Sequence, residues 1–526
     1  MMFHCGLPMR FVTLWCVLLV GVAGGAAGEL GPPERSYNIL MLLPVSSKSH
    51  RNVFVPLAEV LAHRGHQVTM LTNHRKIEKH HPNIHEFTHG LPDYQHENIS
   101  MFDFLKDPTG GLSKHVKIAP IIARELYKVS AVKDLYEKRK EFDLIIVDQL
   151  FNEVAYPFVH EMPFIMVTTP GYDYRQSAVL GNVLHPGYVP NHMTDYPNPY
   201  SFWHRVRNTL THIGIAIFWR TWAVVPLVQE EISAQFPDLP PLLDLERNLS
   251  LALMNTHFST GIPMPLLPSQ VEVGGMHCRP PSPLPQELES WITEAGAEGV
   301  IYFNLGSVMQ GTTMPVKYRD LFIEAFRRLP QRVLWKHEGE LEDLPDNVMT
   351  SKWLPQQDIL AHHNVKVFIT HGGLLSLQEA IYHATPLLAL PVFADQPRNA
   401  MLLKKFEVGD FLTWEELSVD IIVNTLTDII NCPKYKENVV RMSAGMRDQL
   451  MSPRERAVFW TEYVIRHRGA PQLRSPAARL SWVEFFMLDV LLLLHLALFL
   501  LIFILRRILK VMTTKAFGNN NSKKKE

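Results

Sequence analysis

The sequence has little cysteine and no excess of charge. Only four cysteines occur, and Cys278 and Cys432 are the two that lie beyond residue 28, so they can form at most one disulfide. We expect them to stay as free, buried thiols. The 51 basic and 52 acidic residues leave a formal net charge of −1, which gives no electrostatic reason to expect nucleic acid. No Asp-x-Asp pair occurs either, so the usual carboxylate pair for a divalent metal is missing.

Residues 1–28 have the pattern of a secretory signal peptide. Arg10 precedes an apolar run from Phe11 to Val22, and small residues stand before Glu29. Such a segment is cleaved, which would place the mature chain in the secretory pathway. With 526 residues and 47% hydrophobic composition, that chain can bury at least two cores.

A second apolar run, residues 485–505, is long enough to cross a bilayer as one helix. Arg506, Arg507 and Lys510 follow it, and such a basic flank belongs on the cytosolic side. We therefore expect a single-pass membrane protein with residues 29–480 in the lumen and a cytosolic tail over 506–526. Lysines close to the C-terminus resemble a dilysine retrieval signal, which indicates the endoplasmic reticulum.

Strands and helices alternate in the lumenal part. The pattern predicts a strand over 38–43, a helix over 53–63 and a strand over 67–72. A second start of this kind begins with a strand over 300–304. Such units build parallel sheets, so we predict two doubly wound α/β domains.

A proline-rich passage separates the two expected domains. Its prolines cannot continue a helix or a central strand, so residues 261–286 are predicted to be the linker. The N-terminal domain would then cover 29–260 and the C-terminal domain 287–480. An amphipathic helix is predicted near 454–468, toward the end of the second domain.

One segment, residues 353–396, carries most of the functional information. It contains a buried strand over 367–370, the glycine turn His371-Gly372-Gly373, and a helix that opens near Leu375. This order directs the N–H groups of a helix N-terminus at an anion, and a phosphate fits that description.

The polar residues around this turn resemble, in order and spacing, the donor-binding signature of the UDP-glycosyltransferases. The run HGGLLSLQEA is most similar to arthropod members. The resemblance implies the GT-B fold, with two Rossmann-like domains facing a cleft, an acceptor in the first domain and a UDP-sugar in the second. It assigns the UDP-sugar to Ser307, Trp353, Gln356, His371, Gly373, Ser376, Glu379, Asp395 and Gln396.

The sequence departs from that signature at two positions. Leu375 stands where many relatives carry Asn, which removes one phosphate donor. Ala384 replaces the usual Gly after Tyr382 and His383.

Transfer of a sugar to a hydroxyl requires a base, because an alcohol is a poor nucleophile until its proton leaves. His50 follows the first strand, and Asp148 follows the apolar strand over 144–147. Both therefore belong at strand carboxyl ends, where the carboxylate can hold the imidazole Nδ1–H. They also match the family's catalytic dyad. The structural alternative for Asp148 is a cap on the following helix.

This arrangement predicts a direct displacement with inversion, without an essential metal and with no further cofactor. The arthropod-like motif implies UDP-glucose, while UDP-glucuronic acid stays an alternative donor. Its carboxylate would need a cation, and Arg398 is close in sequence but is expected to be a solvated loop residue.

The acceptor cannot be identified from the sequence. Residues 200–228 mix Trp, Phe and Arg with apolar residues, so they fit a lipophilic acceptor pocket, a membrane-interface segment or an ordinary buried helix. The first two favour small lipophilic molecules that carry a hydroxyl. A UDP-sugar epimerase, a catalytically silent sugar-binding subunit and a lipid carrier are the other classes, and assembly into homo- or hetero-oligomers stays open.

Overall fold

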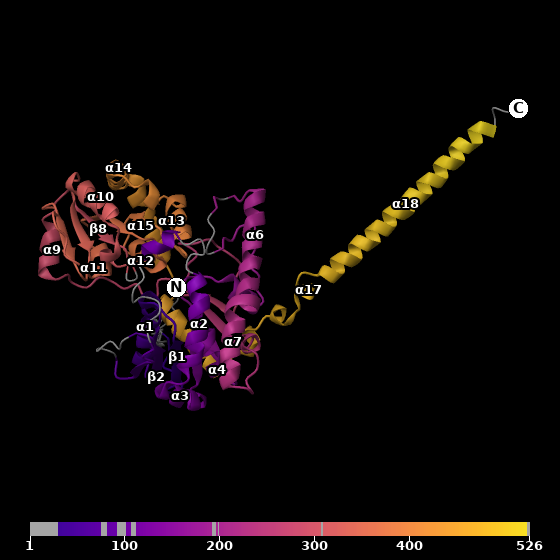
Figure 1. Ribbon diagram of the computed structural model, residues 1–526, viewed down its shortest axis with the longest axis horizontal. Coiled ribbons are helices and arrows are strands. Elements are labelled where there is room, and N and C mark those ends of the chain that lie inside the picture. The colour runs from indigo at the N-terminus through magenta and orange to yellow at the C-terminus, as the bar shows by residue number, and fades with distance from the viewer. Residues whose placement is uncertain are drawn as a thin grey trace, which may run out of the picture.

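The computed structural model describes residues 30–74, 81–91, 101–106, 112–191, 196–197, 199–306 and 309–522. The predicted signal peptide, the terminal lysines and Ser307 lie outside these ranges. Figure 1 shows two α/β domains side by side and a long C-terminal helix that leaves the body of the molecule. Each domain is built on one sheet, with seven strands in the first and six in the second.

The N-terminal sheet is parallel throughout, with the order β3-β2-β1-β4-β5-β6-β7. Its strands are β1 (Asn38–Leu43), β2 (Gln67–Thr72), β3 (Ile84–Thr88), β4 (Leu144–Asp148), β5 (Phe164–Thr168), β6 (Leu251–Met254) and β7 (Gln270–Glu272). Leu40 and Leu42 pack on one side of the sheet, while Ile39 and Met41 belong to the core on the other. Helices therefore cover both faces, which explains the near-continuous apolar runs of the strands.

The helices of this domain begin with α1 (Lys48–His63), which starts five residues before the predicted 53–63 helix. Ser47 caps it by accepting a hydrogen bond from the backbone N–H of His50, and this cap extends the helix upstream of the apolar pattern. The others are α2 (Leu112–Leu126), α3 (Ser130–Glu137), α4 (Tyr156–Val159), α5 (Tyr174–Val179), α6 (Phe202–Ile217), the π-helix η4 (Phe218–Ala223), α7 (Val224–Gln235) and α8 (Leu242–Glu246).

The C-terminal sheet has the order β10-β9-β8-β11-β12-β13, again parallel. Its strands are β8 (Val300–Asn304), β9 (Arg332–Lys336), β10 (Val348–Ser351), β11 (Val365–Thr370), β12 (Leu387–Ala389) and β13 (Gly409–Phe411). The helices around it are α9 (Gln286–Thr293), α10 (Val316–Arg327), α11 (Gln356–Leu360), α12 (Leu374–Tyr382), α13 (Gln396–Lys405), α14 (Val419–Asn431) and α15 (Pro433–Arg447). The ligand site of such a sheet lies at the carboxyl ends of its strands.

The domains are joined at several places. The 3-10 helix η1 (Met101–Lys106) packs Phe102 and Phe104 against the core of the C-terminal domain, and the chain crosses between the domains at two further segments. The predicted linker, 261–286, contains β7, so the chain leaves the first sheet only after Glu272. The second connection leads into α16 (Pro453–Arg466), which returns to the N-terminal domain and packs against α1. Ala457 and Val458 enter the core of that domain, and Glu462 accepts hydrogen bonds from Arg64 and His66.

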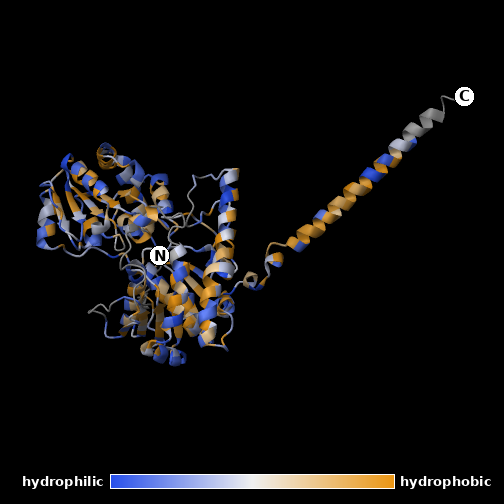
Figure 2. Cartoon of the chain, viewed as in Figure 1, coloured by the Kyte–Doolittle hydropathy of each residue, from blue (hydrophilic) through white to orange (hydrophobic). Residues whose placement is uncertain are grey.

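The C-terminal apolar run forms a helix with different bounds from the predicted 485–505. Phe485 is the last residue of the short helix α17 (Trp482–Phe485). Met487 has a positive φ of 50°, which interrupts the helical conformation between α17 and the next helix. The long helix α18 (Leu488–Ser522) begins after this break and continues well past residue 505. Figure 2 shows its first part as almost uniformly hydrophobic. By length and composition, residues 488–515 and residues 202–235 are both candidate membrane spans among the described residues.

Candidate active site

The side chains of His50 and Asp148 meet at the carboxyl edge of the N-terminal sheet. His50 lies in the first turn of α1, directly after β1, and Asp148 is the last residue of the adjacent strand β4. The His50 Nδ1 lies 2.8 Å from Asp148 Oδ2, and Asp148 is fully buried while His50 stays 18% exposed. The following 3-10 helix has Asn152 at its N-cap, so Asp148 does not cap it. This geometry leaves Nε2 of His50 as the ring nitrogen to which no described residue hydrogen-bonds.

A third residue joins this pair. Thr169, just after β5, donates from its hydroxyl to Asp148 Oδ1 at 3.0 Å, and its oxygen lies 2.9 Å from His50 Nδ1. The Nδ1–H is thus shared between a carboxylate and a hydroxyl oxygen, which fixes the tautomer and the ring plane. The sequence analysis did not identify Thr169, because only the order of strands in the sheet places β5 beside β4.

The glycine turn lies at the carboxyl end of β11 in the other domain. The His371 ring fits between two glycines so closely that a Cβ on Gly306 would lie 2.6 Å from its Cε1, and one on Gly373 2.4 Å from its Nε2. Burial lowers the pKa of His371 to about 4, so the ring is a neutral donor or acceptor at pH 7. Gly373 is the N-cap of α12 and has no side chain to satisfy the first N–H groups, which are open to an anion.

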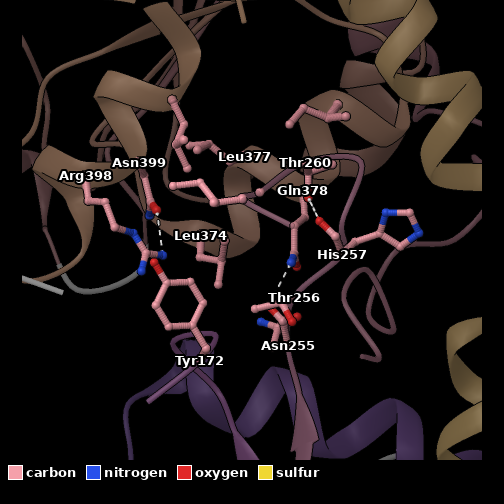
Figure 3. Close-up of a pocket in the computed structure, with 14 residues that line it drawn as sticks. Tyr172, Asn255, Thr256, His257, Thr260, Leu374, Leu377, Gln378, Arg398 and Asn399 are labelled. Carbon is pink, nitrogen blue, oxygen red and sulfur yellow. Dashed lines mark hydrogen bonds between the residues drawn. The ribbon is translucent and has the colours of Figure 1, made fainter. Parts of the chain in front are cut away.

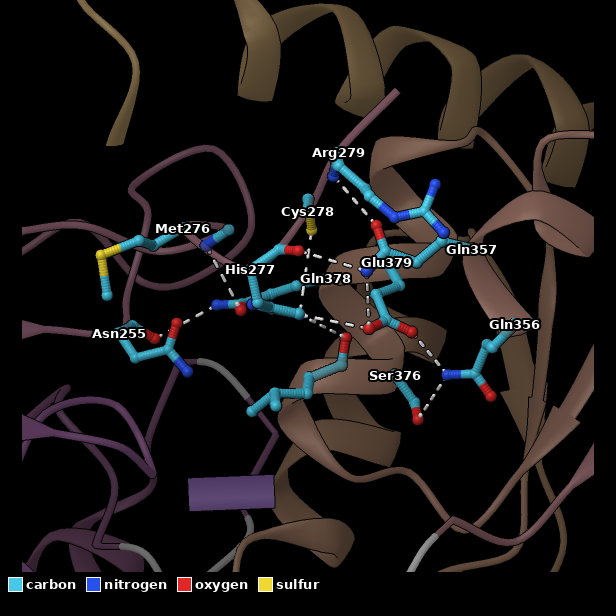
Figure 4. Close-up of polar contacts among 12 residues, drawn as sticks. Asn255, Met276, His277, Cys278, Arg279, Gln356, Gln357, Ser376, Gln378 and Glu379 are labelled. Carbon is cyan, nitrogen blue, oxygen red and sulfur yellow. Dashed lines mark hydrogen bonds and ion pairs between the residues drawn. The ribbon is translucent and has the colours of Figure 1, made fainter. Parts of the chain in front are cut away.

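Behind the turn, α11 and α12 bring together a cluster of amides and one carboxylate (Figure 4). Gln356 donates from Nε2 to Glu379 Oε2 at 2.5 Å and to Ser376 Oγ at 3.2 Å. Its carbonyl accepts from Asn304 Nδ2 at 2.6 Å. Burial raises the pKa of Glu379 to about 7, and the hydrogen bonds from Gln356 and Gln357 oppose that rise.

A linker histidine lies next to the same carboxylate. His277 Nε2 is 3.7 Å from Glu379 Oε1 and donates to the carbonyl of Leu375 at 3.2 Å. Burial lowers the pKa of His277 to about 4, so the imidazole is neutral and the contact is not an ion pair. Cys278 is buried beside it, and both Cys278 and Cys432 are free thiols. Cys432 is only partly buried, so the expectation of two buried thiols was wrong for this residue.

Asp395 and Gln396 lie where α13 begins. Asn399 donates from Nδ2 to Asp395 Oδ2 at 2.7 Å and to the carbonyl of Gly372 at 3.0 Å, so it ties this corner to the glycine turn. Gln396 accepts from the N–H of Val392 with its carbonyl. Burial raises the pKa of Asp395, and the charges of Arg398 and of His50, in the facing domain, lower it in part. Direct contacts bring this part of the C-terminal domain against the N-terminal one, since the Arg398 guanidinium lies over the ring of Tyr172.

Comparison with known proteins identifies the family of the chain. Residues 40–524 match the family described as UDP-glucoronosyl and UDP-glucosyl transferase. The chain belongs to the UDP-glycosyltransferase family. It is 36% identical over 516 residues to the UDP-glycosyltransferase UGT5 of Dactylopius coccus, covering 93% of this chain and 95% of the relative. It is 32% identical over 478 residues to UDP-glucuronosyltransferase 2B9 of Macaca fascicularis, covering 86% and 88%.

Solved structures support the fold of this UDP-glycosyltransferase. The calicheamicin glycosyltransferase CalG4 is 17% identical, with a TM-score of 0.55 over 83% of this chain and 100% of that structure. The spinosyn forosaminyltransferase SpnP gives a TM-score of 0.54 at 16% identity over 82% and 100%. The expected GT-B fold is confirmed, and the chain is a glycosyltransferase enzyme.

Trp353 and Arg398 of this UDP-glycosyltransferase differ strongly in exposure. Trp353 is 70% exposed and lies three residues before Gln356 in the sequence. Arg398 was expected to be a solvated loop residue, and this was wrong: it is 6% exposed and its guanidinium lies 4.8 Å from the ring centre of Tyr172 in the other domain. Figure 3 shows Tyr172 and Arg398 lining a small interdomain pocket together with Leu374.

Proposed function

We propose that this UDP-glycosyltransferase transfers a hexosyl group, with inversion, from UDP-glucose to a hydroxyl of a small lipophilic acceptor. The observation that carries the proposal is the hydrogen-bonded set of His50, Asp148 and Thr169 at the carboxyl ends of the N-terminal strands. Nε2 of His50 is the atom that takes the acceptor proton, and Asp148 stabilises the imidazolium that forms.

The leaving diphosphate is stabilised by the α12 N-terminus. In this proposal the N–H groups of α12, His371, Gly373 and Ser376 hold the phosphates, with Ser307 as a further donor outside the described ranges. Their alignment supplies electrostatic stabilisation as the bond to the anomeric carbon breaks. Within the described ranges, no group of three or more His, Cys, Asp and Glu side chains is placed to hold a metal.

The rest of UDP-glucose is assigned to the remaining donor residues. Trp353 stacks on the base, Gln356 and Glu379 hold the nucleoside, and Asp395 and Gln396 accept and donate at sugar hydroxyls. Glucose is favoured over glucuronic acid because Arg398 already lies against Tyr172 and is buried there. A glucuronate carboxylate would need an available cation near Asp395.

Helix α6 supports a lipophilic acceptor and a membrane location. Its buried residues are polar, Asn208 and His212, and Asn208 donates to the carbonyls of Pro186 and Val189. Its exposed residues are mostly apolar and include Trp203 at 69% and Leu210 at 64%, with Arg205 and Arg207 exposed among them. Large apolar side chains mixed with arginines on one exposed surface fit a membrane interface. We assign the chain to the membrane of the endoplasmic reticulum, anchored by α18 with its catalytic domains in the lumen.

The test is product formation in microsomes that express the full chain. UDP-glucose and UDP-glucuronic acid are offered separately to a panel of phenols, beside His50→Ala. We expect a β-glucoside from the unchanged chain and a loss of about 10²–10⁴-fold in His50→Ala, with UDP binding retained. UDP binding without any conjugate would favour the silent subunit instead, and free sugar without acceptor would favour an epimerase.

Glycosylation and membrane extraction test the assignment to the membrane of the endoplasmic reticulum. Asn248 is exposed and starts the sequon Asn248-Leu249-Ser250, so a lumenal domain would carry a glycan there that endoglycosidase H removes. Resistance of the chain to alkaline carbonate extraction would show that it is integral. An unglycosylated, extractable chain would contradict both parts of the assignment.

A further inference from the structure

A chain of buried polar contacts connects the donor helix α12 to the proposed catalytic pair in the other domain. It begins at Gln378, which lies between Ser376 and Glu379 in sequence. At 100° per residue Gln378 is turned away from Ser376, toward the N-terminal domain. It is 1% exposed, although no charged partner or ligand role explains a buried amide there.

The Gln378 amide bonds to the N-terminal domain and the linker at once. Its Nε2 donates to the backbone carbonyl of Asn255, directly after β6, at 3.1 Å. Its Oε1 accepts from the N–H of Gly275 in the linker at 3.3 Å. Figure 4 shows the amide pointing from α12 toward Asn255.

Asn255 in turn hydrogen-bonds to the residues that follow β5. Its Nδ2 donates to the backbone carbonyl of Thr169 at 2.9 Å, and its own N–H donates to the carbonyl of Thr168 at 3.1 Å. Thr169 is the residue whose hydroxyl bonds to Asp148 and lies against His50. Asn255, Thr169 and Asp148 are all buried, so water does not compete for these bonds.

We propose that Gln378 and Asn255 are positioning residues that set the catalytic pair in register with the bound UDP-sugar. The proposal rests on the proposed function, since it takes His50 as the base and α12 as the phosphate-binding helix. In this proposal one side of α12 holds the diphosphate and the other side carries Gln378. A shift of the helix would therefore pull on Asn255 through Gln378, and on the Thr169 backbone through Asn255. Removal of Gln378 would therefore lower turnover and leave nucleotide binding intact.

The variants are Gln378→Ala, Asn255→Ala and their combination, with Gln378→Glu as an isosteric form. The glutamate keeps the acceptor for Gly275 N–H and loses the donor to Asn255. The matched control is Asn364→Ala, because Asn364 is also a buried amide that donates at 3.1 Å to a backbone carbonyl, that of Ile292, but within one domain. Melting temperatures identify any variant that does not fold, and Gln378→Glu then replaces Gln378→Ala.

We expect each single variant to lower kcat about tenfold while the Kd of UDP changes less than about twofold. The double variant should lose no more than the stronger single one, because both residues belong to one chain of contacts. Asn364→Ala should match the unchanged chain in kcat. Multiplicative losses, weaker UDP binding at unchanged kcat, or an equal loss in Asn364→Ala would overturn the proposal.

A second readout does not require turnover. The rate at which diethyl pyrocarbonate acylates His50, followed on its peptide by mass spectrometry, reports how the ring is held. Gln378→Ala should raise this rate at least about twofold, although the residue lies in the other domain, and Asn364→Ala should not. If no donor gives product yet this rate changes, the proposed function fails and the positioning role stands. If product forms and neither kcat nor the rate responds, the positioning role fails alone.

Discussion

Gln356 donates a 2.5 Å hydrogen bond to Glu379, whose pKa burial raises to about 7. Ribose hydroxyls would donate to the same carboxylate, and an ionised carboxylate accepts them more strongly than a protonated one. UDP should therefore bind more tightly as the pH rises through about 7, with release of a proton.

Titration calorimetry between pH 5.5 and 8.5, in buffers of different ionisation enthalpy, measures both effects. In Glu379→Gln the affinity should be lower and nearly independent of pH. The folded protein also holds this proton more tightly than the unfolded chain, so the contribution of Glu379 to stability is lost as the pH rises from about 4.5 to about 7. A UDP affinity that does not change across this range in the unchanged chain would contradict the assigned role.

Thr169→Val should lower kcat about tenfold without changing the Kd of UDP, because it removes the hydroxyl that bonds Asp148 and contacts His50. Thr169→Ser keeps the hydroxyl and should retain most of the activity. Steady-state kinetics with both variants gives the answer, and a loss in Thr169→Ser with activity retained in Thr169→Val would point to packing of the methyl group instead.

Gly373→Ala should weaken UDP binding at least about tenfold, or about 1.4 kcal/mol. Its new Cβ would lie 2.4 Å from His371 Nε2, so the ring or the turn must move. Gly214→Ala is the control, since a Cβ there meets no atom within 4 Å. Calorimetry on both variants tests this, and tight binding by Gly373→Ala would show that the turn does not hold the phosphates.

Ala384→Gly should raise the free energy of unfolding by about 0.5–1 kcal/mol. Ala384 follows α12 with a φ of 57°, which costs a residue with a Cβ about 1–2 kcal/mol, more than the extra freedom of glycine in the unfolded chain. Alanine in place of the family's glycine therefore lowers the free energy of unfolding. Ala361→Gly, at an ordinary helical φ of −75°, should be destabilising instead. Thermal unfolding of both variants decides the matter.

Removal of metal by EDTA should leave glucosyl transfer within about twofold, because the proposed leaving-group stabilisation comes from the α12 N-terminus. Initial rates with and without EDTA measure this. Complete loss that Mn²⁺ restores would show that a metal is needed.

Much of the fold could be predicted from the sequence, because its signals are local. The strands over 38–43, 67–72 and 300–304 appear with those bounds, since each is an apolar run between polar turns. The placement of His50 after the first strand and of Asp148 at the end of another was also visible in the sequence, and the pairing of β1 with β4 brings the two side chains together. The start of α1 was missed although Ser47 was a visible cap signal.

The contacts between domains could not be predicted in this way. Arg398 follows a loop in sequence and is buried only because Tyr172 of the other domain covers it. Gln378 and Asn255 are separated by a whole linker, and no periodicity relates them. Such pairs depend on how two separate cores pack together, which is a property of the complete chain.

The return of α16 to the first domain links the two domains a second time. The chain passes between them at the linker and again before α16, and Phe102 of η1 also packs against Trp414 in the core of the C-terminal domain. After α16 the chain stays with the N-terminal domain, where Arg474 donates to the carbonyl of Asn248 and Ala478 packs against Gly181. The candidate membrane span α18 therefore continues from the N-terminal domain. Any rotation between the domains would move the C-terminal domain relative to that span.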